Sequence, residues 1–134
     1  MAEKTDILIV DDEMDMRIYI SRVLQSAGYT PTAVREGGEA VRRARRLQPG
    51  LIILDVMMPG EGGAETYRRL IGDPELRQTP VLVASAVQEE SFRHYLKMLA
   101  VRVKEKIPYP AAYLEKPFEP EQLLELVGQI LPDR

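Results

Sequence analysis

Five short apolar runs, each followed by a longer amphipathic segment, constrain this chain more than any other feature. The predicted strands cover residues 7–10, 29–34, 51–54, 80–84 and 112–115, and the predicted helices cover 15–27, 38–48, 64–71, 89–104 and 121–131. Strands that read as continuous apolar runs are typical of a parallel sheet buried on both faces. Because crossover connections are right-handed, the pattern predicts an α/β fold, a doubly wound five-stranded parallel sheet with helices on both faces.

Length and composition narrow the possible functions. The 134 residues predict a single domain over 1–134, and the net charge of −3 gives no reason to expect a nucleic-acid or membrane partner. The chain has no cysteine and one histidine, which excludes disulfides and makes a zinc centre a poor hypothesis. The first apolar run spans only Ile7–Val10, too short for a signal peptide, so we expect a cytoplasmic protein.

Polar residues stand where the predicted strands end. Asp11 and Asp12 follow the first strand, Asp55 the third, Ser85 the fourth and Lys116 the fifth. In an open parallel sheet, ligands bind beyond the carboxyl ends of the strands, at the point where the strand order reverses. The sequence therefore predicts three carboxylates, a hydroxyl and an ammonium group at one edge of the sheet.

These groups favour one kind of chemistry. Carboxylates gathered in a small space repel one another and must bind protons or a cation, and hard oxygen ligands favour Mg²⁺ over zinc. A carboxylate beside Mg²⁺ can act as a nucleophile toward a phosphoryl group and form an acyl phosphate. Lys116 can contact one phosphoryl oxygen and Ser85 can donate a hydrogen bond to another.

At these residues the chain resembles the receiver domains of two-component response regulators, along nearly its full length. The matching pieces are Val10-Asp11-Asp12-Glu13, Leu54-Asp55-Val56-Met57-Met58-Pro59, Gly63, Ser85-Ala86 and Tyr113-Leu114-Glu115-Lys116-Pro117-Phe118. Each piece alone is weak evidence for the family, but their order along the chain and their places at strand ends are together highly specific for it. The resemblance implies a flavodoxin-like fold with strand order 2-1-3-4-5.

The resemblance also implies roles for particular residues. Asp55 would be the phosphoacceptor, and Mg²⁺ would be held by Asp11, Asp12, Asp55 and the backbone carbonyl of Met57. We expect Asp12 and Asp55 to bind the metal directly and Asp11 to act mainly through water.

A second set of residues would contact the phosphoryl group or respond to it. By resemblance these are Ser85 with the adjacent Ala86, the aromatic Tyr113, and Lys116. We also expect the Lys116–Pro117 peptide bond to be cis, since this geometry would turn Lys116 toward Asp55.

The implied partner is a histidine kinase or a histidine phosphotransfer protein. The downstream protein partner is unknown, a homodimer is possible, and no membrane contact is expected. Such a domain catalyses at most its own phosphotransfer and autodephosphorylation, so we do not expect an enzyme in the ordinary sense. The chain ends one helix after Phe118, so we expect no output domain within it; it could act alone or be part of a longer protein.

Four other interpretations of the sequence are possible. A phosphatase of the haloacid-dehalogenase type also forms an aspartyl phosphate, but it needs a second Asp two residues later, where this chain has Met57. A pseudo-receiver usually lacks the Asp or the Lys, and both are present here. A flavodoxin needs a phosphate-binding loop after the first strand, and no such loop of Ser, Thr and Gly follows Val10. The arginines at 42, 43, 45 and 46 could bind nucleic acid, but without interleaved aromatics a solvated helix face is the better interpretation.

The stretch between Ser85 and Lys116 departs from the family pattern. It is longer than usual and lacks the Gly-Ala-Asp that commonly ends the fourth helix. An apolar stripe at Phe92, Leu96, Leu99 and Val103 predicts a helix extending to about Lys104. Its outer surface would be basic, with Arg93, His94, Lys97 and Arg102 off the stripe. We expect phosphorylation to shift this segment; the alternative is that the extra residues only lengthen a loop.

Overall fold

The computed structural model describes residues 5–57 and 62–132 and shows alternating strands and helices. The strands are β1 (Asp6–Val10), β2 (Thr30–Val34), β3 (Leu51–Leu54), β4 (Val81–Ser85) and β5 (Ala112–Glu115). The helices are α1 (Met14–Ser26), α2 (Gly37–Leu47), α3 (Gly63–Gly72), α4 (Glu89–Val103) and α5 (Pro120–Ile130). Every predicted element is present, and no bound differs from the prediction by more than one residue. Met58 and Pro59, which end the second matching piece, lie outside the described residues.

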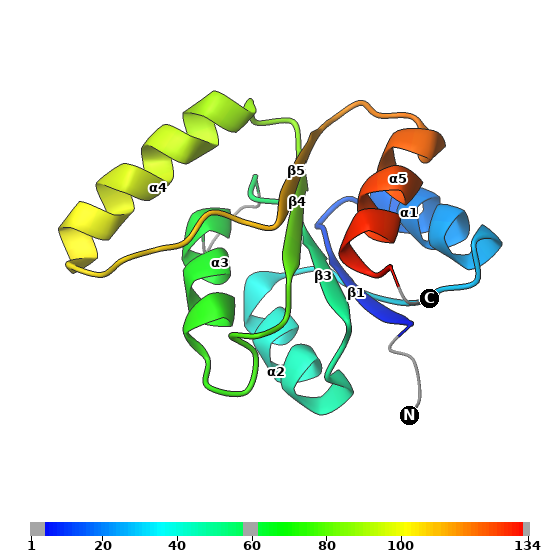
Figure 1. Cartoon of the computed structure of the whole chain (residues 1–134), viewed down its shortest axis with the longest axis horizontal. Helices are drawn as coiled ribbons and strands as arrows, with labels where there is room; N and C mark the ends of the chain where they lie inside the picture. Colours follow the sequence, from blue (N-terminus) through cyan, green and yellow to red (C-terminus); the bar gives the residue numbers. More distant parts are fainter. Residues whose placement is uncertain (1–4, 58–61, 133–134) are drawn as a thin grey trace.

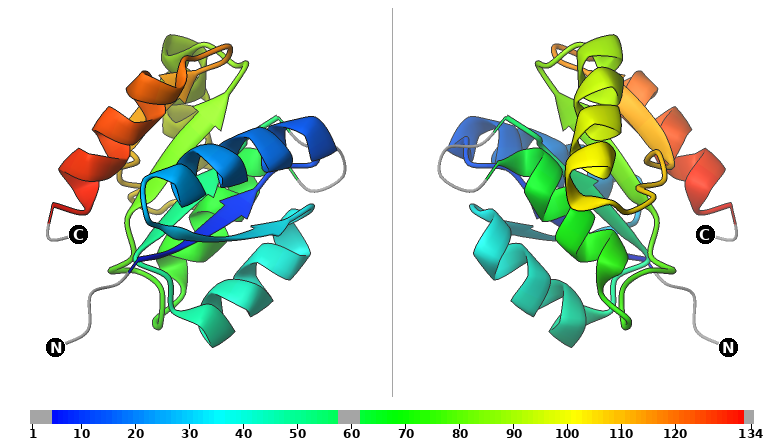
Figure 2. Two further views of the ribbon diagram at one scale, coloured as in Figure 1. Left: turned by 90° about the vertical axis from the view of Figure 1, so that its right-hand side faces the viewer. Right: turned by 90° about the vertical axis from the view of Figure 1, so that its left-hand side faces the viewer.

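The strands form one parallel sheet in the order β2-β1-β3-β4-β5, which confirms the predicted topology. Helices α1 and α5 cover one face and α2, α3 and α4 cover the other (Figures 1 and 2). Each strand sends alternate side chains to opposite faces. In β1, Leu8 and Val10 join the core under α2, α3 and α4, while Ile7 and Ile9 join the core under α1 and α5.

Helix ends follow local sequence signals. Gly28, which follows the C-cap residue Ala27 of α1, has a φ of 91°, a left-handed conformation that glycine adopts without steric penalty. Helix α5 begins with Pro120, and its preceding Glu119 forms a capping box with Gln122. Both boundaries agree with the predicted helix ends.

The long fourth helix is confirmed. Helix α4 ends at Val103, and Lys104 follows in a left-handed conformation with a φ of 58°. Phe92, Leu96 and Leu99 are buried, whereas Val103 is half-buried. The predicted basic residues are exposed, as expected, at Arg93, His94, Lys97 and Arg102.

The outer surface of α4 is not purely basic, however. Three large apolar side chains are also exposed there, Tyr95 at 52%, Met98 at 61% and Val101 at 78%. The buried stripe did not predict them, because they lie on the other side of the helix.

The arginine-rich helix α2 has the expected solvated character. Arg42 and Arg46 are exposed, and Arg45 binds the buried carboxylate of Asp73 at 2.6 Å. Among the helices in the described part of the chain, none is both long and apolar enough to cross a membrane.

Candidate functional site

Strand register brings the predicted site residues together at one edge of the sheet. Val10 pairs with Leu54 in the adjacent strands β1 and β3, so Asp11 and Asp55 leave the sheet at the same level. The Asp55 amide donates to the Val10 carbonyl at 2.9 Å, which fixes this alignment. On the other side of β3, the Lys116 amide donates to the Ser85 carbonyl at 2.8 Å. Backbone hydrogen bonds therefore position the site before any side chain contributes.

The three aspartates lie close enough to share a cation. One carboxylate oxygen from each of Asp11, Asp12 and Asp55 can be chosen so that all three lie within 4.8 Å of one another. Asp11 is 1% exposed and Asp55 is 4% exposed, whereas Asp12 is half-buried. Buried carboxylates at this spacing repel one another, and a divalent cation with oxygen ligands would relieve that repulsion. The donor set therefore fits Mg²⁺.

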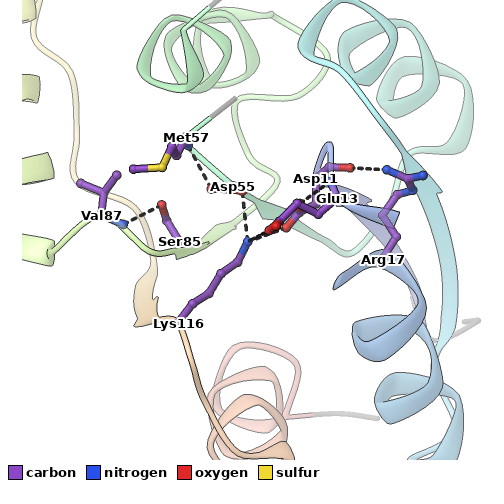
Figure 3. A network of polar contacts seen from close by, with 8 residues as sticks. All are labelled: Asp11, Glu13, Arg17, Asp55, Met57, Ser85, Val87 and Lys116. Carbon is purple, nitrogen blue, oxygen red and sulfur yellow. Dashed lines mark hydrogen bonds and ion pairs between the residues drawn. The ribbon is translucent and has the colours of Figure 1, made fainter. Parts of the chain in front are cut away.

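Lys116 lies at the centre of the polar network (Figure 3). Its Nζ donates to Asp11 Oδ2 at 2.9 Å and to Asp55 Oδ2 at 3.1 Å, and lies 3.4 Å from Glu13 Oε1. Burial alone would lower the pKa of Lys116, but the hydrogen bond to Asp11 and the charges of Asp55 and Asp11 raise it above 10.5. The side chain is therefore a cation at neutral pH.

Asp11 is fully engaged by protein groups. Its Oδ1 accepts the Glu13 amide at 2.9 Å, its Oδ2 accepts Lys116, and its backbone carbonyl accepts Arg17 at 2.8 Å. Burial raises the pKa of Asp11 despite the hydrogen bond from Lys116. By contrast, no described residue donates a hydrogen bond to Asp12, whose carboxylate is therefore the most available of the three for a metal.

Both oxygens of Asp55 are also oriented by the protein. The Met57 amide donates to Asp55 Oδ1 at 2.9 Å, while Lys116 holds Oδ2. The Met57 side chain is 58% exposed. Its amide thus has a defined role, while the role of its carbonyl as a metal ligand stays a prediction.

Ser85 lies on the other side of Asp55 and is completely buried. Its Oγ accepts the Val87 amide at 3.1 Å, and the Val87 carbonyl accepts the Tyr113 hydroxyl at 2.6 Å. Burial raises the pKa of Tyr113 to about 12, so the hydroxyl remains a donor. Ala86 is exposed in the loop between Ser85 and Val87.

The structure brings Asp11, Asp12, Asp55 and Lys116 together, and the Met57 amide contacts Asp55. Ser85 and Tyr113 are joined through the Val87 backbone, whereas Ala86 is exposed. The Lys116–Pro117 bond is cis, as predicted. Glu13 and Arg17 were not assigned roles from the sequence, although Glu13 belongs to the acidic motif after β1. Val87 was also missed, because it acts through its backbone and its side chain carries no signal.

The comparisons with known proteins agree with this geometry. Residues 7–128 match the family model described as the response regulator receiver domain. The chain is 29% identical over 125 residues to PilH of Pseudomonas aeruginosa, covering 93% of this chain and 96% of that protein. It is 35% identical to PetR of Rhodobacter capsulatus, a match that covers 97% of this chain but half of that longer protein.

Solved structures give the same result. The chemotaxis response regulator CheY4 of Vibrio cholerae superposes with a TM-score of 0.78 at 28% identity, over 94% of this chain and 98% of that one. The receiver domain of the sensor histidine kinase PA1611 of Pseudomonas aeruginosa superposes with a TM-score of 0.79 at 25% identity, over 98% and 99%. That structure is described with a magnesium ion coordinated in its active-site cleft. The fold, the strand-end residues and the match over 7–128 together show that the chain belongs to the response-regulator receiver domains of two-component signalling.

Proposed function

We propose that this receiver domain accepts a phosphoryl group on Asp55, with Mg²⁺ held by Asp12 and Asp55, and changes conformation as a result. The observation that carries the proposal is the position of the buried Asp55 carboxylate between a carboxylate pair and the ammonium group of Lys116. This arrangement supplies the positioning and charge neutralisation on which phosphoryl transfer depends.

Receiver domains bind Mg²⁺ in an acidic pocket, and the pocket of this chain offers suitable ligands. When bound, Mg²⁺ would neutralise charge on the aspartates and on the incoming phosphoryl oxygens. We assign direct ligation to Asp12 and Asp55, since Asp12 accepts no hydrogen bond from the described residues. We assign Asp11 to contact through water, because both of its oxygens accept hydrogen bonds from protein groups and it is the most buried of the three aspartates.

Receiver domains take phosphoryl groups from histidine kinases or histidine phosphotransfer proteins, and we propose one of these as the donor here. An Asp55 oxygen would attack the phosphorus of a phosphohistidine, forming an O–P bond as the P–N bond breaks. The electron pair of that bond leaves on the imidazole, which takes a proton. Lys116 would stabilise a phosphoryl oxygen throughout. Later hydrolysis of the acyl phosphate would return Asp55 to the carboxylate, and we propose no reaction beyond these two.

Ser85 and Tyr113 would carry the response. The Ser85 hydroxyl is a donor that can turn from the Val87 backbone toward a phosphoryl oxygen. Val87 would then lose the partner of its amide, and its carbonyl holds Tyr113 at 2.6 Å. A change at Asp55 thus has a direct route to the aromatic side chain of β5.

The test is labelling with a small phosphodonor in the presence of Mg²⁺, followed by intact mass measurement. We expect one phosphoryl group that is stable to acid and released by hydroxylamine, and none in Asp55→Ala. The matched control is Glu13→Ala, which removes an exposed carboxylate 3.4 Å from Lys116 but leaves the three aspartates. Undiminished labelling of Asp55→Ala would show that another residue is the acceptor.

A further inference from the structure

A cluster of contacts ties the segment after α4 to the first turn of that helix. The Tyr109 hydroxyl donates to Glu89 Oε2 at 2.7 Å, and Arg93 Nη2 lies 3.4 Å from the same oxygen. The Arg93 guanidinium carbon lies 4.1 Å from the centre of the Tyr109 ring, a cation–π geometry. We call Tyr109, Glu89 and Arg93 the Tyr109 clamp. It closes the unusual segment 104–111 back onto the start of α4.

The clamp is adjacent to the loop that responds to Asp55. Glu89 is two residues after Val87, whose amide binds Ser85 and whose carbonyl binds Tyr113. The Glu89 amide donates to Glu115 Oε2 of β5 at 3.0 Å, so the first turn of α4 is anchored through both its backbone and its side chain. Movement of Val87 therefore acts directly on Glu89.

Aromatic packing links Tyr109 to Tyr113 by a second route. The buried Phe92 ring lies 5.5 Å from the Tyr113 ring and 6.5 Å from the Tyr109 ring, measured between centroids. Tyr67 of α3 packs on Phe92 at 6.2 Å. Since closely packed interiors transmit displacements, a shift of Tyr113 must be accommodated by Phe92 and its other neighbours.

The opposite side of the segment is held by α3. The Tyr67 hydroxyl donates to the Pro108 carbonyl at 2.5 Å, and Arg68 pairs with Glu105 at 3.2 Å. Segment 104–111 thus bridges α3 and the first turn of α4, as the chain runs back beside α4 toward β5 (Figure 1). With α3 as a fixed support, the clamp resists displacement of the first turn of α4.

We propose that Tyr109 is a positioning residue of the switch, which holds the Ser85–Val87 loop in its present place and so opposes the response to phosphorylation. The inference rests on the proposed function. When Ser85 turns to a phosphoryl oxygen, the Ser85–Val87 loop and Glu89 must move. This movement would strain the contacts of Glu89 with Tyr109 and Arg93. Coupling between two sites is reciprocal, so loosening the clamp must strengthen binding of a phosphoryl group at Asp55.

The experiment titrates the full chain, in saturating Mg²⁺, with beryllofluoride as the phosphoryl analogue. Tyr109→Phe removes the hydroxyl that binds Glu89 but keeps the ring on Phe92 and Arg93. We expect beryllofluoride to bind this variant on the order of tenfold more tightly than the unmodified protein, the lower end of what one hydrogen bond to a charged partner contributes. The matched control is Tyr95→Phe, because the exposed Tyr95 hydroxyl makes no hydrogen bond within the described residues.

Hydrogen exchange supplies an independent readout. In the unmodified protein, beryllofluoride should lower amide protection in residues 104–111, whereas in Tyr109→Phe protection there should already be low without it. Thermal unfolding of each variant reports any purely structural role, which would change stability but not affinity for beryllofluoride. Glu89→Gln, which keeps an acceptor but removes the charge that binds Arg93, should show the same direction of change.

The outcomes separate this inference from the proposed function. If the unmodified protein does not bind beryllofluoride with Mg²⁺, the proposed function fails and the inference fails with it. If the unmodified protein binds it, but Tyr109→Phe and Glu89→Gln bind it equally or more weakly, only the role of the clamp is overturned. A gain of affinity in Tyr95→Phe as large as in Tyr109→Phe would also overturn it.

Discussion

Gly63 begins α3 at a point where no side chain can be accommodated. A Cβ added there would overlap the Cα, the carbonyl carbon and the carbonyl oxygen of Val56, the residue after Asp55. These are backbone atoms, so no rotamer change can relieve the overlap, and either α3 or the chain following β3 must move. We therefore expect Gly63→Ala to reduce the free energy of unfolding by about 3 kcal/mol, at the upper end of ordinary overpacking. For a domain of this size, that loss lowers Tm by about 10 °C.

The assay is urea and thermal denaturation followed by circular dichroism. Gly128→Ala is the matched control, because Gly128 is exposed within α5 and an added Cβ meets nothing within 4 Å. Replacing a helical glycine by alanine without a clash should stabilise the protein by about 0.5–1 kcal/mol. Opposite signs for the two variants are the expected result. A Gly63→Ala variant as stable as the unmodified protein would refute the close approach of α3 to Val56.

Two further predictions concern ionisable groups. By mass action, Mg²⁺ at ten times its Kd should raise the free energy of unfolding by about 1.4 kcal/mol. Asp12→Asn should abolish most of this gain in stability. An equal gain in the variant would contradict the assignment of Asp12 as a ligand. For Asp73, burial alone would raise the pKa, but the Glu75 amide and Arg45 lower it below 3.8. The stabilisation from Asp73 is therefore present above pH 3.8 and is lost as the pH falls through the lower folded-state pKa. Asp73→Asn should flatten the acid limb of a plot of stability against pH. An unchanged acid limb would count against a stabilising Arg45–Asp73 ion pair.

The predictable part of the fold follows from hydrophobic pattern. The runs at Ile7–Val10 and Leu51–Leu54 are apolar throughout because both faces of β1 and β3 are covered, and period-2 alternation divides each run between two cores. Edge strand β2 is less regular, since four of its five residues, Thr30 to Ala33, are not fully buried. Its prediction rested on β-prone residues and began one residue early, at Tyr29.

The site was predictable where side chains carry the chemistry and not where the backbone does. Asp11, Asp55 and Lys116 stand at strand ends, so parallel topology alone brings them together. Val87 contributes an amide and a carbonyl, which any residue has, and no sequence pattern marks it. The Tyr109 clamp was also beyond prediction, because it depends on how segment 104–111 folds back on α4, and the sequence indicates only that Pro108 and Pro110 prevent a helix there.

In the proposed function Asp55, and no other carboxylate of the acidic cluster, carries the phosphoryl group. The most direct test treats the protein with a small phosphodonor and Mg²⁺, reduces it with borohydride, and locates the modified residue by peptide mass spectrometry. An acyl phosphate is reduced to an alcohol, so the peptide containing Asp55 should carry homoserine at that position. Unmodified Asp55 together with a reduced Asp11 or Asp12, or no reduced residue in a protein shown to bind Mg²⁺, would show that Asp55 is not the phosphoacceptor.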